Sequence, residues 1–273
     1  MILRILKAIR NPYYTIYAGA KRFILKYEGF SYSFRDNGEE RLLDALSEIN
    51  VKTVFDVGAN IGSWTEIASL KFNSAKVHSF EISQATFNSL QKKHGNNERI
   101  FLNNFGLSDR QGEFAYKDYG ENSGVNSLIT DADFHDQYIS PTLIKAIVKT
   151  GDEYCKKNSI YQIDFLKIDV EGAEHLVLSG FSDLLKVGAI KVIQFEYGYT
   201  HADAKFLIKD FYKLLEKYGY AIGPLKPNGV IFMDFDYALN DFNSGPNFVA
   251  VHKSYNAIIE KVRGKPIKGY PRR

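Results

Sequence analysis

Short apolar runs alternate with longer amphipathic segments through the middle of the chain. The apolar runs predict strands at 53–57, 76–81, 100–105, 165–170 and 191–196. The amphipathic segments predict helices at 63–71, 84–94, 173–179 and 204–217. Strands that alternate with helices are typical of a parallel sheet covered on both faces, so the pattern predicts an α/β fold.

The last part of the chain has a different pattern. Residues 220–225, 229–235 and 248–252 have the composition of strands joined by turns that contain proline and glycine. Such strands would add an antiparallel edge to the mainly parallel sheet. Residues 122–163 show mixed periodicity, and we expect them to form an insertion above the ligand site.

Both ends of the chain are basic. Residues 1–27 contain lysines and arginines but no acid, and apolar residues recur at helical spacing from Ile2 to Ile9, before Pro12. A short basic amphipathic helix of this kind could rest on an anionic membrane or dock on protein, including a second subunit. Docking is favoured, because one short helix binds a membrane weakly. The expected divisions are a basic helical extension (1–45), a main domain (46–255) and a basic tail (256–273).

The composition limits the classes of function. With 273 residues and 45% hydrophobic content, the chain can bury one large core. A net charge of +3 is too small to indicate nucleic-acid binding, so we expect no nucleic-acid partner. The single cysteine, Cys155, excludes an intramolecular disulfide and a cysteine metal cluster. With no long apolar run and no signal-peptide pattern, a cytoplasmic location is expected, with peripheral membrane contact through residues 1–27 as an extension of it.

The segment VFDVGANIG (54–62) predicts a nucleotide-cofactor site, because a strand, a glycine-rich turn and a helix N-terminus follow one another. A dinucleotide fold would have G-x-G-x-x-G here, but position 60 is Asn60 and Asp56 precedes the turn. A carboxylate at that place would repel a pyrophosphate. It could favour a ligand with an amino group and a sulfonium, which points to S-adenosylmethionine rather than to a nicotinamide cofactor.

Polar residues follow the predicted strands at the edge where such sheets bind ligands. Each alone could be a helix cap or a turn residue, but together they outline a polar crevice. Glu81 is placed to accept hydrogen bonds from both ribose hydroxyls. Asn104 could meet the adenine edge or close an Asx-turn. The strand-end residues are Asp56, Glu81, Asn104, Asp169 and Glu196, with Glu171 just beyond the fourth strand.

Transfer of a methyl group to an alcohol requires a base, because an alkyl hydroxyl is a poor nucleophile at neutral pH. Asp169 or Glu171 is the expected base, and the other would orient the cofactor or the acceptor. Glu196 lies at the next strand end, and His201 is an alternate base. His135, in the insertion, is expected at the surface. Mg²⁺ on Asp169 and Glu196 is a weaker hypothesis because no third ligand is evident, and no metal is assigned.

Six segments resemble the FkbM family of S-adenosylmethionine-dependent methyltransferases. They are VFDVGANIG (54–62), HSFEIS (78–83), NNFGLSD (103–109), NSGVNSL (122–128), DFLKIDVEGAE (164–174) and VIQFEYG (192–198). Two positions depart from the family pattern, with Ile82 where proline is frequent and Gly106 where alanine is frequent. The resemblance implies a class I, Rossmann-like methyltransferase fold with a seven-stranded sheet. The cofactor residues expected from the motifs and the resemblance are Asp56, Gly58, Ala59, Asn60, Gly62, Glu81, Ile82, Asn104, Gly106, Leu107 and Asp169.

The expected function is S-adenosylmethionine-dependent O-methylation of a sugar, glycan or glycolipid precursor. Two alternatives stay open: another small-molecule acceptor, and a catalytically silent subunit that keeps the fold for binding. The acids at the strand ends argue against the silent subunit, since a site without chemistry does not need them. A homo-oligomer is compatible with the sequence.

Overall fold

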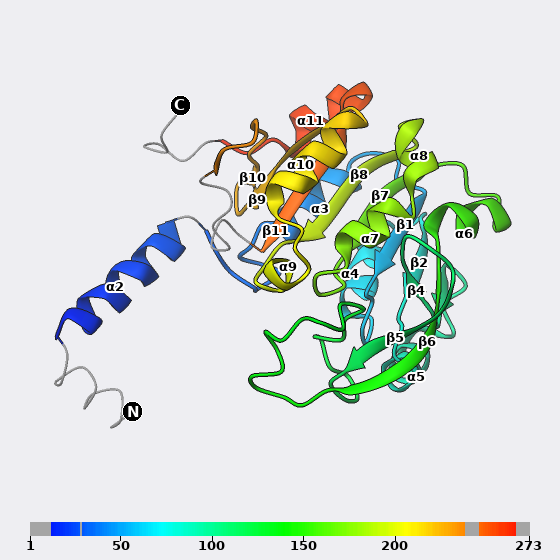
Figure 1. The fold of residues 1–273 in the computed structure, drawn as a ribbon. Helices are drawn as coiled ribbons and strands as arrows, with labels where there is room; N and C mark the ends of the chain where they lie inside the picture. The colour runs from blue at the N-terminus through cyan, green and yellow to red at the C-terminus, as the bar shows by residue number, and fades with distance from the viewer. Residues whose placement is uncertain (1–11, 28, 238–245, 266–273) are drawn as a thin grey trace.

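The computed structural model describes residues 12–27, 29–237 and 246–265. In these residues the core is an eight-stranded sheet with the order β10-β9-β11-β8-β7-β1-β2-β3 (Figure 1). Its strands are β1 (Thr53–Val57), β2 (Lys76–Phe80), β3 (Ile100–Asn103), β7 (Ile163–Ile168), β8 (Ile190–Glu196), β9 (Tyr220–Lys226), β10 (Gly229–Val230) and β11 (Asn247–His252). The α/β fold expected from the sequence is confirmed.

Five neighbouring strands, β3, β2, β1, β7 and β8, are parallel. β11 lies between β8 and β9 and is antiparallel to both, which confirms the expected antiparallel edge. The chain builds outward from β1 in one direction and from β7 in the other. The ligand crevice of such a sheet lies at this switch point, beyond the carboxyl ends of β1 and β7. The family resemblance implied seven strands, and β10 is the eighth: of the strand expected at 229–235 only residues 229–230 pair, with the end of β9.

Helices cover both faces of the sheet. Buried residues of α3 (Glu39–Ser47), α4 (Ser63–Lys71) and α11 (Asn256–Val262) form a core on one face. Those of α7 (Glu174–Ser179), α8 (Ser182–Lys186) and α10 (Ile208–Lys217) form the core on the other. The remaining helices near the sheet are α5 (Gln84–His94), α6 (Gly151–Lys157), α9 (Thr200–Asp203) and a short 3₁₀ turn, η2 (Lys253–Tyr255).

α10 shows why these segments are helical and where one begins. Its buried residues Ile208, Phe211, Tyr212 and Leu215 recur every three or four residues and form one apolar stripe. The helix begins at Ile208 rather than at residue 204, because the Asp210 carboxylate accepts the backbone N–H of residue 207 at 3.0 Å and caps the end.

The expected C-terminal tail is partly a structural element. Ile258, Ile259 and Val262 of α11 are buried, in the same core as α3. α3 itself spans the division expected after residue 45. Residues 39–47 and 256–262 therefore complete the core of the main domain, and residues 266–273 lie outside the described part of the chain.

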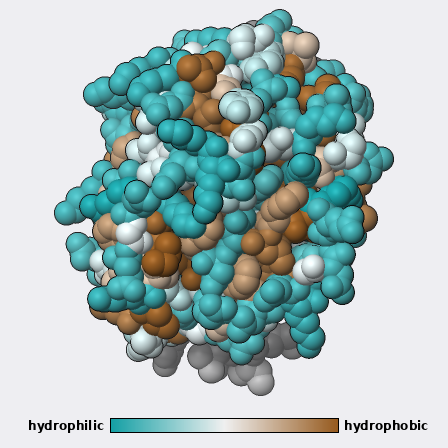
Figure 2. Space-filling view, turned by 90° about the vertical axis from the view of Figure 1, so that its right-hand side faces the viewer, coloured by the Kyte–Doolittle hydropathy of each residue, from teal (hydrophilic) through white to brown (hydrophobic). Residues whose placement is uncertain are grey.

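A second sheet of three strands, in the order β4-β6-β5, stands beside the main one. Its strands are β4 (Gly106–Leu107), β5 (Gly112–Asp118) and β6 (Thr142–Lys149). The segment between β5 and β6 contains much of the expected insertion. Figure 2 shows the side of the molecule that carries this sheet as mostly hydrophilic, with separate hydrophobic patches.

α2 (Pro12–Tyr27) projects away from the rest of the molecule (Figure 1). The helix expected from Ile2 to Ile9 lies outside the described residues. No helix in the described residues is both long enough and apolar enough to cross a membrane.

Candidate active site

The glycine-rich turn after β1 is shaped by two glycines with positive φ. At Gly58 (φ 83°) a Cβ atom would lie 1.8 Å from the carbonyl oxygen of Asp169, so β1 and the loop after β7 could not approach each other with any other residue there. Gly62 (φ 80°) is the N-cap of α4, and a Cβ there would collide with Leu90 and His94. The turn therefore requires glycine at both positions.

A cavity lies between this turn and the ends of β2 and β7. Most of the expected cofactor residues line it: Gly58, Asn60, Glu81, Ile82, Gly106, Leu107 and Asp169. Residues that were not among the expected cofactor residues complete its wall: Val57, Phe80, Ser123, Gly124, Asn126, Leu128 and Val170. Four of these belong to the expected insertion, whose backbone is held against the turn by a hydrogen bond from Asn60 Nδ2 to the carbonyl of Ser123 (2.8 Å).

Glu81 is held firmly in the cavity wall. Its Oε1 accepts the N–H of Ser83 at 2.8 Å, and its Oε2 accepts the N–H of Asn60 at 2.9 Å. Burial raises the pKa of Glu81 to about 7, against the lowering effect of these two hydrogen bonds. Each oxygen keeps a lone pair, so the carboxylate can still accept hydroxyl groups from a ligand.

Four expected cofactor residues do not line the cavity: Asp56, Ala59, Gly62 and Asn104. Asn104 Nδ2 donates to the backbone carbonyl of Glu81 at 3.0 Å, so this amide supports the wall. Ala59 and Gly62 act through the backbone of the turn, where the Ala59 N–H donates to the carbonyl of Phe80.

The side chain of Asp56 does not lie in the cavity wall, contrary to the expectation that it meets the cofactor. Its carboxylate is fully buried, and Oδ2 accepts a hydrogen bond from Thr65 Oγ1 of α4 at 2.6 Å. Because side chains alternate along a strand, Asp56 shares the α4 face of the sheet with Val54, and it points away from the cavity. Burial raises its pKa, and the charge of Lys167 opposes that rise.

Lys167, inside the apolar strand β7, links Asp56 to the site. Its Nζ lies 3.0 Å from Asp169 Oδ2 and 3.6 Å from Asp56 Oδ1. Burial alone would lower the pKa of Lys167, but Asp169 and Asp56 raise it, so the lysine stays charged. A lysine within an apolar run was the signal for this buried pairing, and sequence reasoning missed it.

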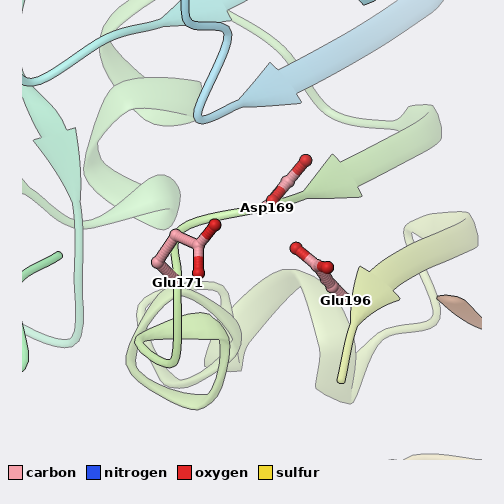
Figure 3. Close-up of side chains that lie close together, drawn as sticks. All are labelled: Asp169, Glu171 and Glu196. Atoms are coloured by element: carbon pink, nitrogen blue, oxygen red, sulfur yellow. The ribbon is translucent and has the colours of Figure 1, made fainter. Parts of the chain in front are cut away.

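Asp169, Glu171 and Glu196 come together, as expected from the strand ends. One carboxylate oxygen of each lies within 4.8 Å of the others. Figure 3 shows Asp169 and Glu171 on the loop after β7 and Glu196 at the end of β8, with their carboxyl groups close to one another. We call these three residues the carboxylate cluster.

The surroundings shift the pKa values of the three acids in the carboxylate cluster in different directions. Burial raises the pKa of Glu196 well above its usual range, and the charges of Asp169 and Glu171 add to this rise. Burial also raises the pKa of Glu171, against the effect of His135. At Asp169 burial is outweighed by Lys167 and by a hydrogen bond from Glu196, so the pKa is lowered. Of the three acids, Asp169 is therefore the one most stabilised as an anion, and Glu196 is the one that most favours its protonated form.

The loop that carries Glu171 is strained and tightly held. Glu171 has φ 54°, which is uncommon for a residue other than glycine, and Gly172 follows with φ 99°. Glu174 fixes this turn, because its carboxylate accepts the N–H groups of Val170 (2.8 Å) and Gly172 (2.9 Å). Strained backbone that is held in this way is often found at functional sites.

His135 and Ser127, both in the expected insertion, dock on this loop. His135 Nε2 lies 3.2 Å from Glu171 Oε2, and Ser127 Oγ donates to the Glu171 carbonyl at 2.7 Å. His135 is therefore part of the site and not a surface residue, with its side chain 19% exposed. His135 and Glu171 are 36 residues apart in the chain, and no local sequence pattern could have paired them.

His201 corrects the expectation of an alternate base. Its ring is 1% exposed, its Nδ1 accepts the N–H of Gly198 at 3.1 Å, and its Nε2 lies 2.9 Å from Glu174 Oε2. A histidine buried in the core with this contact to Glu174 is not positioned to reach an acceptor. It instead supports Glu174 and, through it, the Glu171 loop.

Aromatic rings from distant segments lie near the carboxylate cluster. Tyr199, after β8, stacks on Phe134 of the insertion with ring centroids 5.1 Å apart. Tyr32, between α2 and α3, has an exposed ring; partial desolvation of its hydroxyl and then the charges of Glu196, Tyr199 and Glu171 raise its pKa. The carboxylate oxygens are close enough for a divalent cation, but acidic clusters also form without an ion, and we assign no metal here.

Comparisons with known proteins add to this geometry. Residues 56–222 match the family described as Methyltransferase FkbM domain. Over 212 residues the chain is 27% identical to the hexuronic acid methyltransferase AglP of Haloferax volcanii, an alignment that covers 74% of this chain and 82% of that protein.

Two solved structures are similar at low sequence identity. A TehB-like S-adenosylmethionine-dependent methyltransferase from Corynebacterium glutamicum aligns with a TM-score of 0.39 and 14% identity, covering 88% of this chain and 98% of that one. A putative rRNA methylase from Clostridium thermocellum aligns with a TM-score of 0.43 and 13% identity, covering 79% and 95%. The family match from Asp56 to Ile222 includes every residue of the cavity wall, and the chain belongs to the FkbM family of S-adenosylmethionine-dependent methyltransferases.

Proposed function

We propose that the protein transfers a methyl group from S-adenosylmethionine to a hydroxyl of a sugar ring. The observation that carries the proposal is the position of Asp169, which belongs both to the cavity wall and to the carboxylate cluster. The residue thus joins a cofactor pocket to a group of acids that could accept a proton from the attacking hydroxyl.

The cavity residues fit the methyl donor. Glu81 could accept hydrogen bonds from two ribose hydroxyls, and Ile82 and Leu107 offer apolar surface to the adenine ring. Asp169 keeps a negative charge at the cavity wall, which would attract the ammonium and sulfonium of the cofactor. The sulfonium supplies the methyl group, and the neutral thioether of S-adenosylhomocysteine is the leaving group.

Glu171 is the best-placed base. His135 and Ser127 hold its side chain and backbone, so its carboxylate has a defined position. The raised pKa of Glu171 makes it a stronger base than Asp169, which is stabilised as an anion by Lys167. Glu196, whose pKa is raised furthest of the three, would carry a proton and donate it to the acceptor or to Asp169.

The surroundings of the carboxylate cluster favour an uncharged sugar. Carboxylates accept hydrogen bonds from hydroxyl groups, and exposed aromatic rings such as Tyr32 and Tyr199 offer flat faces for a sugar ring. The relative AglP is named for a hexuronic acid, which supports a sugar as the acceptor class. A carboxylate on the sugar would, however, be repelled by the charges of Asp169 and of Glu171 as the base. We therefore propose a neutral or amino sugar here.

The proposal is tested by incubating the protein with methyl-labelled S-adenosylmethionine and a panel of nucleotide sugars and lipid-linked glycans. Mass spectrometry should find the label on a hydroxyl oxygen of a neutral or amino sugar. A label carried only by uronic acids, or only by a nitrogen or carboxylate, would contradict the assignment.

Metal-assisted deprotonation is the alternative that the carboxylate cluster itself suggests. Glu171 offers a third oxygen ligand beside Asp169 and Glu196, which was not evident from the sequence. Our mechanism predicts that dialysis against EDTA leaves the methylation rate unchanged. Loss of activity that Mg²⁺ restores would favour the metal-assisted route.

A further inference from the structure

Helix α2 presents an apolar stripe to solvent. Tyr13, Ile16, Tyr17 and Ile24 are 82%, 70%, 62% and 52% exposed. At about 100° per residue these four side chains fall within an arc of roughly 100°, with Ala20 at its centre. We call these five residues the α2 stripe. A soluble surface rarely exposes so much contiguous apolar area without a binding role.

The charge of α2 is of one sign. Lys21 flanks the α2 stripe and Arg22 lies opposite it, Lys26 is a third basic residue in the helix sequence, and the helix contains no acid. The preceding residues 1–11 add three more basic residues and again no acid. A basic helix with an apolar face and tyrosines along it has the composition of a helix that lies in the interface of an anionic membrane.

The same charges argue against a second copy of the chain as the occupant. If two α2 stripes packed together, their lysines and arginines would be brought close with no acid on either helix to pair with them. An anionic lipid surface would instead neutralise them. Charge complementarity thus selects the lipid surface.

The position of α2 connects it with the proposed acceptor side of the site, which is the surroundings of the carboxylate cluster. The helix ends at Tyr27, five residues before Tyr32, and the charges of Glu196 and Glu171 act on the Tyr32 hydroxyl and raise its pKa after the effect of desolvation. Five residues span at most about 18 Å, so the end of α2 cannot lie far from the acceptor side of the site. The N–H of Phe30 also donates to the carbonyl of Leu25 at 2.9 Å and ties the connecting segment to the helix.

We propose that α2 is a membrane-surface anchor that binds anionic lipid headgroups through its basic residues and inserts the α2 stripe into the interface. Bound in this way, the helix would lie flat over about 24 Å and hold the acceptor side of the enzyme at the membrane. The inference stands apart from the methylation chemistry, since it concerns where the enzyme meets its acceptor and not what it transfers.

Vesicle flotation of the full-length protein tests the anchor. The protein should float with vesicles of phosphatidylcholine and phosphatidylglycerol (7:3) and far less with phosphatidylcholine alone, and 0.5 M salt should weaken the binding. The double variant Ile16→Gln/Ile24→Gln should lose about tenfold or more in partitioning, because both side chains leave the apolar stripe without any change in charge. Lys21→Gln/Arg22→Gln should lose binding to the anionic vesicles specifically.

The matched control is Thr15→Gln/Ala18→Gln, which makes the same kind of change away from the α2 stripe and should float like the wild type. Circular dichroism of each variant verifies that it is folded. Wild type that stays unbound, or equal losses in the stripe and control variants, would overturn the anchor. So would a dimer, seen by light scattering without lipid, that only the stripe variant dissociates.

Discussion

Lys167 shows how single residues set the electrostatics of the site. It is a buried cation between two acids. Asp56 is buried on the α4 face of the sheet, and Asp169 lies in the cavity wall. The pairing lets the chain keep a fully buried carboxylate next to the cofactor pocket. It also keeps Asp169 ionised while the pKa of the neighbouring Glu196 is raised.

Lys167→Met should lower the free energy of unfolding by about 3–5 kcal/mol, because Asp56 would be left buried without its cation. Urea denaturation measures this change. The double variant Asp56→Asn/Lys167→Met should regain part of the loss, since it removes the unpaired charge as well. A loss below about 1 kcal/mol in the single variant would mean that the pair does not matter to the fold.

Glu81 should make cofactor binding depend on pH. Hydroxyl donors bind the ionised carboxylate, and burial raises the pKa of Glu81 to about 7, so protonation competes with the ligand below that pH. The affinity for S-adenosylhomocysteine should fall about tenfold between pH 8 and pH 6, measured by calorimetry. Glu81→Gln should bind more weakly at pH 8 and show a flat profile. A wild-type profile that is equally flat would argue against ribose binding by Glu81.

Among the elements, the turn between β1 and α4 has the least tolerance for change. A Cβ at Gly58 would overlap the Asp169 carbonyl, and φ there is positive. Gly58→Ala should cost about 3 kcal/mol or more in the free energy of unfolding and abolish binding of S-adenosylhomocysteine.

Gly124→Ala is the matched control for that variant, because Gly124 also lines the cavity but has open space, with Asn60 Nδ2 at 3.8 Å as the nearest atom. Its stability should stay within about 0.5 kcal/mol of the wild type in the same thermal or urea melts. Equal stabilities for the two variants would show that the close approach at Gly58 is not what the turn requires.

The elements also show how far the sequence could predict the fold. The predicted bounds of β1, α4 and α5 agree with the structure, because each has a clear apolar pattern and a clear end. β5 and β6 were missed since apolar side chains of β6 such as Leu143 and Ile147 are exposed, so the strand lacks a buried face to mark it. β10 has two residues and is set by its partner β9.

The site was predictable where it depends on the sheet and not where it depends on loops. Parallel strands carry their last residues to one edge, so Glu81, Asp169 and Glu196 could be named from the sequence. Contacts between loops, such as that of His135 with Glu171, have no local signature. The inward direction of Asp56 could have been derived from strand alternation, because Phe55 and Val57 lie in the core on the other face of the sheet.

On the scale of the whole molecule, the proposed acceptor side of the site, the surroundings of the carboxylate cluster, is assembled from four separate stretches of chain. Tyr32 comes from the segment before the first core helix, His135 from the insertion, Glu171 from the loop after β7 and Tyr199 from the loop after β8. The cavity, in contrast, is lined mainly by residues at the strand ends and in the glycine turn, with four more from the insertion. This division explains how a shared methyl-donor site can serve a specific acceptor.

The central claim is that the cofactor cavity and the carboxylate cluster form one active site with Glu171 as the base. The direct test is the initial rate of methyl transfer by Glu171→Gln, measured together with its affinity for S-adenosylhomocysteine, with the exposed Asp131→Asn as the control. We predict a rate about 10²- to 10⁴-fold below that of the wild type, an affinity within about threefold, and a control that behaves like the wild type. A Glu171→Gln rate near that of the wild type would contradict the claim.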